Sequence, residues 1–224
     1  MPMGTNETTT SAVSLASVTL EVPDAGAAHR FYTTFGVEQY VRMRESGAPS
    51  SGFRGFALAL TVSRPATVDA FLATAVDAGA TLLKPAARSL WGYGGVVQAP
   101  DGTAWKVATS AKRDSGPATR EIDDVVLLLG VANVKATREF YVGQGLTVAR
   151  SFGGKYTEFA PGGPGAVKLA LYKRPALAKE VGVPADGTGS HRIVLGSTAG
   201  SFADPDGFVW EAVTAAASAP ATRP

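Results

Sequence analysis

The sequence contains no cysteine and only two histidines, His29 and His191, among its 224 residues. Without cysteine the chain can form neither a disulfide scaffold nor a thiolate metal site, and it has no cysteine nucleophile. Two histidines leave little room for a histidine-rich metal site or for Ser-His-Asp chemistry. The side chains of a functional site must therefore be sought mainly among other residue types.

Long apolar runs are also missing, since no stretch reaches the roughly 18 residues that a membrane span needs. The opening MPMGTNETTTSA has neither the basic nor the apolar region of a secretory signal, so we expect a soluble, cytoplasmic protein. Lys and Arg (21) nearly balance Asp and Glu (19), for a net charge of +2. Because these basic residues are scattered rather than clustered, the sequence predicts neither a nucleic-acid partner nor a membrane partner.

An internal repeat is the strongest signal in the sequence. SVTLEVPDAGAAHRFY (17–32) and VLLLGVANVKATREFY (126–141) align without gaps on the closing Phe-Tyr. Each predicts a strand, a capping Asp24 or Asn133, and a short amphipathic helix. A second shared block, PDGTAWK (100–106) and PDGFVWE (205–211), predicts a turn followed by a strand. The chain is therefore predicted to be a duplicated domain.

The repeat sets the predicted domain boundaries. Residues 15–108 and 122–213 form two halves of about 100 residues each, a size that allows a hydrophobic core. A polar linker at 109–121 joins them, and disordered tails are expected at 1–14 and 214–224. Each half indicates two βα units, one of them shortened, and the deletions in the two halves are complementary.

This order of motifs resembles the vicinal oxygen chelate superfamily, which includes glyoxalase I, the bleomycin- and fosfomycin-resistance proteins and the extradiol dioxygenases. The segments VPDAGAAHRFY, VDAGATLLKP, GGVVQAPDGTAWKV and FADPDGFVWEAV carry the resemblance. It implies an α+β fold of two tandem glyoxalase-like domains, built from paired βαβββ units whose curled mixed sheets form open cups. The motifs indicate a fold more strongly than a function, because one fold hosts many chemistries.

The resemblance also implies slots for the side chains that hold a divalent metal in each cup. In the first half these slots fall on Ser17, on Lys106 and on Arg54 or Gly55. None of these residues suits a metal, and the ammonium group of Lys106 would repel a cation. The first cup is therefore expected to hold no metal.

In the second half the corresponding slots fall on Val126, His191 and Glu211. His191 and Glu211 are ligand types that suit Fe, Mn, Zn or Ni. Asp124 lies two residues before Val126, on the same face of the strand, and could supply a third ligand. The alternative interpretation places Asp124 at the surface and makes His191 and Glu211 polar residues that line the cup.

Aromatic and polar residues elsewhere are candidates for contact with a ligand. Trp91 and Tyr93 lie in the glycine-rich segment SLWGYGG (89–95), where aromatic rings can cover a flat ligand or simply pack as a plug. Trp105 and Trp210 are expected to point to the opposite face of their strands, into the core. The complete set of expected ligand-binding residues is Ser17, Trp91, Tyr93, Lys106, Tyr156, Tyr172, His191 and Glu211.

Two functions follow from these patterns. The first is a protein that binds a small aromatic or apolar molecule in a cup and needs no cofactor. The second is a metal-dependent lyase, isomerase or dioxygenase in the second cup, with catalytic His191 and Glu211 and a metal held by Asp124, His191 and Glu211. A scaffold acting through protein contacts is a third alternative. The sequence favours metal-free binding and leaves open whether the chain is a monomer or a homodimer.

Overall fold

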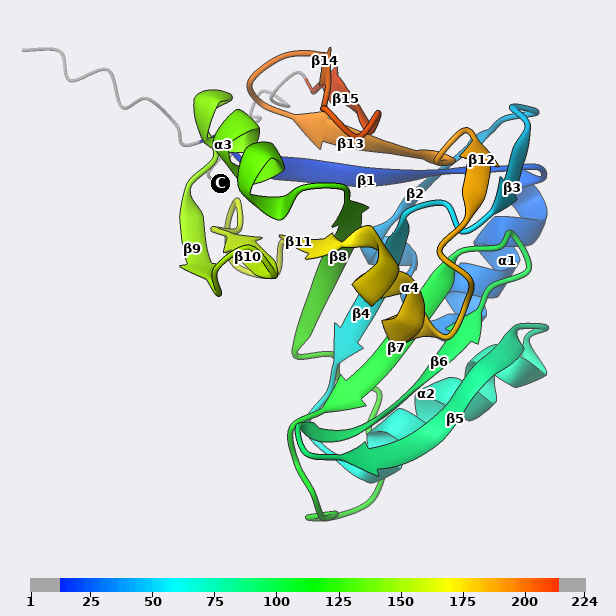
Figure 1. Cartoon of the computed structure of the whole chain (residues 1–224). Helices are drawn as coiled ribbons and strands as arrows, with labels where there is room; N and C mark the ends of the chain where they lie inside the picture. The colour runs from blue at the N-terminus through cyan, green and yellow to red at the C-terminus, as the bar shows by residue number, and fades with distance from the viewer. Residues whose placement is uncertain (1–12, 214–224) are drawn as a thin grey trace, which may run out of the picture.

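The computed structural model describes residues 13–213. Two mixed sheets organise these residues (Figure 1). The smaller has five strands in the order β14 (Phe202–Ala203), β15 (Val209–Ala212), β13 (Ile193–Ser197), β1 (Leu15–Val22) and β2 (Arg42–Glu45). The larger has eight strands in the order β5 (Thr81–Ser89), β6 (Gly92–Gln98), β7 (Ala104–Thr109), β4 (Phe56–Thr61), β8 (Asp124–Val131), β11 (Lys168–Lys173), β10 (Tyr156–Phe159) and β9 (Val148–Ser151). Both sheets are open.

Four α-helices and a short ribbon complete the fold. The helices are α1 (Ala25–Phe35), α2 (Pro65–Asp77), α3 (Val134–Gly143) and α4 (Arg174–Val181), with a 3-10 turn η1 (Glu38–Tyr40) after α1. The ribbon pairs β3 (Ser50–Gly52) with β12 (Gly187–Gly189). The predicted α+β class of paired βαβββ units is confirmed. Within residues 13–213, no helix combines the length and apolar character that a membrane crossing requires.

The repeated motifs form equivalent local structures. Asp24 caps α1 by accepting from the backbone N–H of Ala27, and Asn133 caps α3 in the same way. The Tyr32 hydroxyl, at the end of the first repeat, donates to Asp101 (2.9 Å) in the following Pro-Asp-Gly turn. Tyr141 is its counterpart, and its hydroxyl donates to Asp204 at 2.6 Å. Each tyrosine thus links a helix to the turn of the next unit.

The two tryptophans that follow these turns are fully buried, as expected from strand alternation. The ring of Trp105 packs against Tyr32 with centroids 5.8 Å apart, and Trp210 packs against Tyr141 at 5.3 Å. Both belong to the main hydrophobic core between the sheets and helices α1 to α3. His29 is exposed on α1.

The expectation of one cup for each half of the chain is wrong. Strand β1 of the first half pairs antiparallel with β13 of the second, and β4 pairs antiparallel with β8 across the linker at 109–121. The two complete βαβββ units, 56–109 and 124–173, therefore share the larger sheet, and the two shortened units share the smaller one. These pairings cover strand edges that would otherwise be exposed. The predicted boundaries at 15–108 and 122–213 divide the repeats in the sequence, but each sheet contains strands from both halves.

The predicted tails fall almost entirely on residues 1–12 and 214–224, which lie outside the described residues.

Candidate functional site

One face of the eight-stranded sheet is covered by helix α4, which lies across β7 and β8 on the side away from α2 (Figure 1). We call this surface the α4 face. Small side chains dominate its centre: Ala57 of β4 is in register with Leu128 of β8, which is in register with Ala170 of β11. Leu177, Ala178 and Val181 of α4 pack into the same buried cluster, together with Phe53 and Ala104. The centre of the face is thus occupied by the protein's own helix.

Two lysines from the sheet anchor the end of α4. Lys106 of β7 forms an ion pair with Glu180, and Lys84 of β5 donates to the backbone carbonyls of Lys179 (2.7 Å) and Glu180 (2.8 Å). A cation at this position satisfies carbonyl groups that the helix leaves unpaired and complements the helix dipole. Burial alone would raise the pKa of Glu180, but the hydrogen bond and charge of Lys106, with a contribution from Lys84, hold it below the usual value. The Glu180 carboxylate therefore favours the docked helix in its ionised form.

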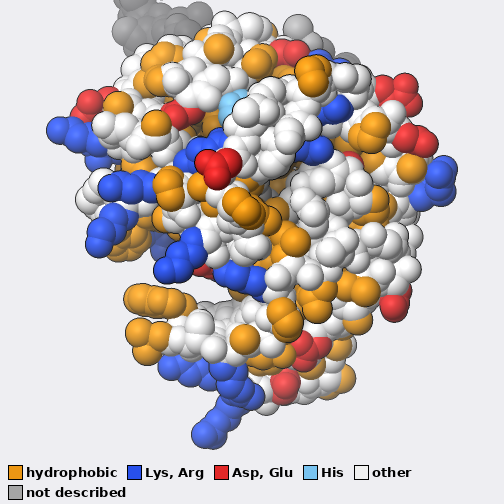
Figure 2. All heavy atoms as spheres, turned by 45° about the vertical axis from the view of Figure 1, so that its right-hand side comes forward, with side chains coloured by type: hydrophobic (Ala, Val, Ile, Leu, Met, Phe, Trp, Pro, Cys, Tyr) orange, Lys and Arg blue, Asp and Glu red, His pale blue; other side chains and the backbone are white. Residues whose placement is uncertain are grey.

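Two cavities remain beside α4 and the chain that follows it. The hairpin cavity (250 Å³) lies beneath the β5–β6 hairpin and is lined by residues that include Lys84, Arg88, Trp91, Tyr93, Lys106 and Glu180. The Arg54 cavity (310 Å³) lies between the start of β4, the turn before β7 and residues 183–186, and its wall includes the Arg54 side chain. In the space-filling view, Lys and Arg side chains border a cleft that opens on the left of the molecule (Figure 2).

The hairpin cavity brings together three of the residues singled out from the sequence: Trp91, Tyr93 and Lys106. Trp91 is 85% exposed, so its ring does not form a packed plug. Tyr93 is positioned by a hydrogen bond from its hydroxyl to Asp69 (2.8 Å), and this bond raises the tyrosine pKa above its usual value. Because Asp69 belongs to α2, the Tyr93 ring points to the other face of the sheet. The cavity therefore has one exposed aromatic ring, that of Trp91, and a largely cationic wall.

Tyr156 and Tyr172 lie in register on the strands β10 and β11 of the same sheet. Their rings meet edge to face with centroids 5.1 Å apart, and the Tyr156 hydroxyl donates to Glu158. Burial and, for Tyr156, the Glu158 carboxylate raise the pKa of both tyrosines. These two residues form a packed pair and do not line the hairpin cavity.

The remaining predicted residues lie around the five-stranded sheet. Ser17 and Glu211 flank Gly196 in one row of this sheet, and His191 precedes β13. His191 lines a 380 Å³ cavity with Glu21 and Arg44, whereas Ser17 lines a separate cavity of 230 Å³. The structure thus places these residues near one sheet without gathering them in one cavity.

The carboxylates of this sheet already have a cation between them. The Arg44 guanidinium, which sequence reasoning missed, lies 2.8 Å from Glu21 and 3.0 Å from Glu211. Hydrogen bonds to Glu21 and Glu211 raise the pKa of Arg44 above its usual value. His191 is also engaged: its ring nitrogens face the carbonyl oxygens of Arg54 and Asp206. The His191 ring is stacked on the ring of Phe208, with centroids 4.1 Å apart.

The structure does not bring together the three residues of the predicted metal triad, Asp124, His191 and Glu211. Asp124 begins β8 in the eight-stranded sheet and pairs with Lys168 at 2.7 Å, whereas Glu211 belongs to the other sheet. The exchange of strands between the halves separates them. No group of three or more His, Asp or Glu side chains within residues 13–213 is arranged to hold a metal ion.

The side chains at the expected metal-ligand positions of both sheets are poor ligands for a divalent metal. On the α4 face these positions hold Lys106 and Val126, which are in register on either side of Ala59, and neither is a metal ligand. On the five-stranded sheet the Arg44 guanidinium takes the place between the carboxylates. The residues present therefore do not fit a divalent metal.

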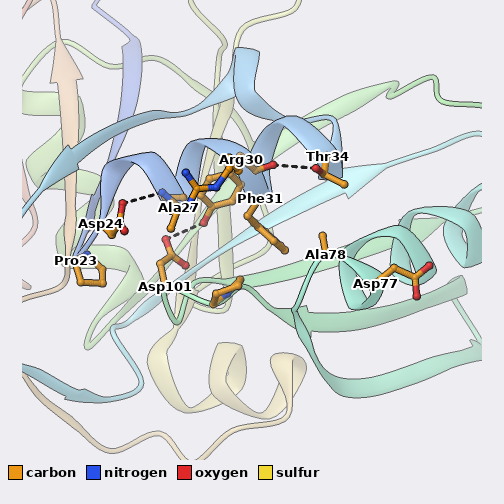
Figure 3. Close-up of a pocket in the computed structure, with 12 residues that line it drawn as sticks. Pro23, Asp24, Ala27, Arg30, Phe31, Thr34, Asp77, Ala78 and Asp101 are labelled. Atoms are coloured by element: carbon orange, nitrogen blue, oxygen red, sulfur yellow. Dashed lines mark hydrogen bonds between the residues drawn. The ribbon is translucent and has the colours of Figure 1, made fainter.

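A larger cavity, 520 Å³, lies on another side of the molecule, between α1, the end of α2 and the turn at 100–101. Figure 3 shows Asp24, Arg30 and Asp101 around it, with the hydrogen bond that Asp24 accepts from the backbone N–H of Ala27 in α1. The carboxylates of Asp24 and Asp101 are engaged in capping α1 and in accepting from the Tyr32 hydroxyl. We therefore assign these groups a structural role.

The fold has clear counterparts among solved structures, although no family model and no curated protein matches the sequence. Glyoxalase I from Zea mays aligns with a TM-score of 0.59 at 15% identity, covering 90% of this chain and 92% of that chain. Its E144Q mutant gives 0.57 at 13% identity, with 90% and 94% covered. A putative dioxygenase from Bacillus subtilis gives 0.55 at 9% identity, with 90% and 84% covered. The chain has the fold of the vicinal oxygen chelate superfamily.

Proposed function

We propose that this protein binds a small aromatic molecule in the hairpin cavity and does so without a metal ion. The observation that carries the proposal is Trp91, a tryptophan that is 85% exposed at the rim of a cavity. Tryptophan is highly buried on average in folded proteins, and an exposed aromatic surface beside a cavity is typical of a binding site. The poor fit of both sheets to a metal does not favour the metal-dependent lyase, isomerase or dioxygenase.

The charges around the cavity support an aromatic ligand. Lys84, Lys106 and Arg88 contribute three positive charges, against one negative charge from Glu180. Each of them has a partner in the protein: both lysines bind α4, and Arg88 donates to the backbone carbonyl of Lys112. The cavity thus offers a positive field, which attracts the electron-rich face of an aromatic ring.

The size of the cavity limits the ligand. Its 250 Å³ is slightly below the roughly 300 Å³ at the small end of ordinary ligand sites. A molecule of one ring or two fused rings therefore matches the space better than a larger compound. Stacking on Trp91 would supply most of the apolar contact.

Titration with indole, monitored by backbone NMR shifts and calorimetry, tests this proposal. We expect saturable shifts at the amides of Gly92, Gly94 and Gly95 in the wild type, and binding roughly five-fold or more weaker in Trp91→Ala, because stacking contributes on the order of 1 kcal/mol or more. Phe152→Ala is the matched control, since Phe152 is also exposed (63%) but lies outside the cavity. Equal loss in both variants, or shifts that do not saturate, would show that the hairpin cavity is not a binding site.

A further inference from the structure

The Arg54 cavity has the features of a separate binding site. Phe53, Phe56, Val183 and Pro184 give it apolar walls, and the guanidinium of Arg54 gives it a positive charge. Its volume of 310 Å³ exceeds that of the hairpin cavity, and the two cavities share no lining residue. Any ligand of this cavity can therefore be distinguished from a ligand at Trp91.

The Arg54 guanidinium is only partly satisfied. Its Nη2 donates to the backbone carbonyl of Asp101 at 2.6 Å, but its Nη1 is buried and has no hydrogen-bond partner among the described residues. Gly102 lets the guanidinium lie against the turn: a Cβ there would come within 2.8 Å of Nη2 and 3.6 Å of Nη1. A charged donor that is buried without a partner is costly, so the group gains when an acceptor reaches it.

The neighbouring carboxylates do not meet this need. Asp101 accepts from the Tyr32 hydroxyl and from the backbone and side chain of Thr103, and no hydrogen bond joins its carboxylate to Arg54. Asp186 also lines the cavity, but it is exposed and makes no ion pair with a residue in the 13–213 range. The charge of Arg54 is therefore available to an incoming anion.

A second arginine reinforces the positive charge. Arg192 is the only residue other than glycine with a positive φ (56°) in the described part of the chain, and its Nε is also buried without a partner there. Burial lowers the pKa of Arg54; Asp101 acts in the opposite direction, and the charge of Arg192 lowers it further. Strained backbone and unpaired buried donors are often found at binding sites.

We propose that the Arg54 cavity binds a small aromatic carboxylate, with the carboxylate on the Arg54 guanidinium and the ring between the apolar walls. The planar fork of a guanidinium matches the two oxygens of a carboxylate. Nη1 is shielded from solvent, so the Arg54 side chain would have to turn slightly toward the ligand. This movement would replace an unpaired donor by a charge-assisted hydrogen bond. The phenylalanines and the proline at 184 provide the flat apolar surfaces that a ring requires.

A comparison of benzoate with benzamide tests this inference on the wild-type chain. The two probes have the same shape and differ in charge, so we expect benzoate to bind at least roughly ten-fold more tightly. Backbone NMR should place the shifts at Phe53, Gly102 and Thr103. Equal affinity for the two probes overturns the inference. Shifts confined to Gly92 and Gly94 also overturn it, while leaving the proposed function in place.

Substitution of the arginine provides a second measurement. Arg54→Lys retains the charge but loses the fork, and we expect benzoate to bind roughly ten-fold or more weakly. Arg113→Lys, at an exposed position outside the cavity, is the matched control and should bind benzoate as the wild type does. Unchanged affinity in Arg54→Lys overturns the assignment. If that variant does not fold, the comparison of the two probes on the wild type still decides.

Discussion

Apolar burial, rather than the ion pair at its end, is expected to hold helix α4 on the sheet. Leu177 of α4 is completely buried on the α4 face, whereas the Glu180 side chain that pairs with Lys106 is 44% exposed. These two residues lie less than one helical turn apart. Leu177→Ala and Glu180→Gln therefore separate the two contributions within one element.

The expected costs differ several-fold. Replacing a buried leucine by alanine costs about 2–5 kcal/mol, and the value is larger where the surroundings cannot close the cavity. Leu177 belongs to the same buried cluster as Ala57 and Ala170, whose short side chains cannot extend into the space it leaves, so the cost should lie in the upper half of that range. A solvent-exposed ion pair contributes about 0.2–1 kcal/mol, which limits the effect of Glu180→Gln.

Urea unfolding at neutral pH measures both free energies. Leu90→Ala is the control for the loss of a leucine side chain, because Leu90 is 78% exposed and its removal should change stability by no more than about 0.5 kcal/mol. A cost for Glu180→Gln equal to or above that of Leu177→Ala would refute the reasoning. A cost below about 1 kcal/mol for Leu177→Ala would refute it as well, since it would mean that α4 is not packed as a core element.

Three further outcomes can be checked. Because the pKa of Glu180 is lowered in the folded protein, its ionised carboxylate stabilises the fold fully above the usual glutamate pKa of about 4.3. This stabilisation is lost as the pH falls through the lowered pKa. The free energies of unfolding of the wild type and Glu180→Gln, measured in urea, should therefore converge in acid. Tyr141→Phe should cost about 1.5–3 kcal/mol in the same assay, because it removes a buried hydroxyl that donates to Asp204. Elemental analysis after dialysis against Mn²⁺ or Zn²⁺ should find less than stoichiometric metal in the wild type and no further loss in His191→Ala, and a stoichiometric ion lost in that variant would contradict the fit of the residues.

Local structure was predictable because it depends on neighbours in the sequence. The strand, the capping residue and the amphipathic helix of each repeat, and the turn before each tryptophan, all appear as predicted. The partners of the strands were not predictable in the same way. The centre of β4 and most of β8 are buried on both faces, so their residue patterns do not say which neighbour each one takes.

The same limit explains which of the predicted site residues the structure brings together. Trp91 and Lys106 line one cavity because a hairpin and the strand paired with it bring them together, and this pairing is local. Asp124 was assigned to the wrong neighbours because its position depends on which sheet receives β8. Arg44 was missed because its role follows from the pairing of β2 with β1, which places it beside Glu21.

The docking of α4 and the poor fit to a metal have a common physical cause. A helix can approach a sheet closely only where the facing side chains are short, and Ala57, Ala104 and Ala170 provide such a surface. Carboxylate or imidazole ligands at the centre of this face would be longer and would need either a cation or water, both of which a packed helix excludes. Lys106 takes part in the same arrangement, because its ammonium group is the counter-ion of Glu180 on the helix. The residues that make the face unsuitable for a metal are therefore those that allow α4 to fill its centre, and the cavities that we propose as binding sites lie beside the helix.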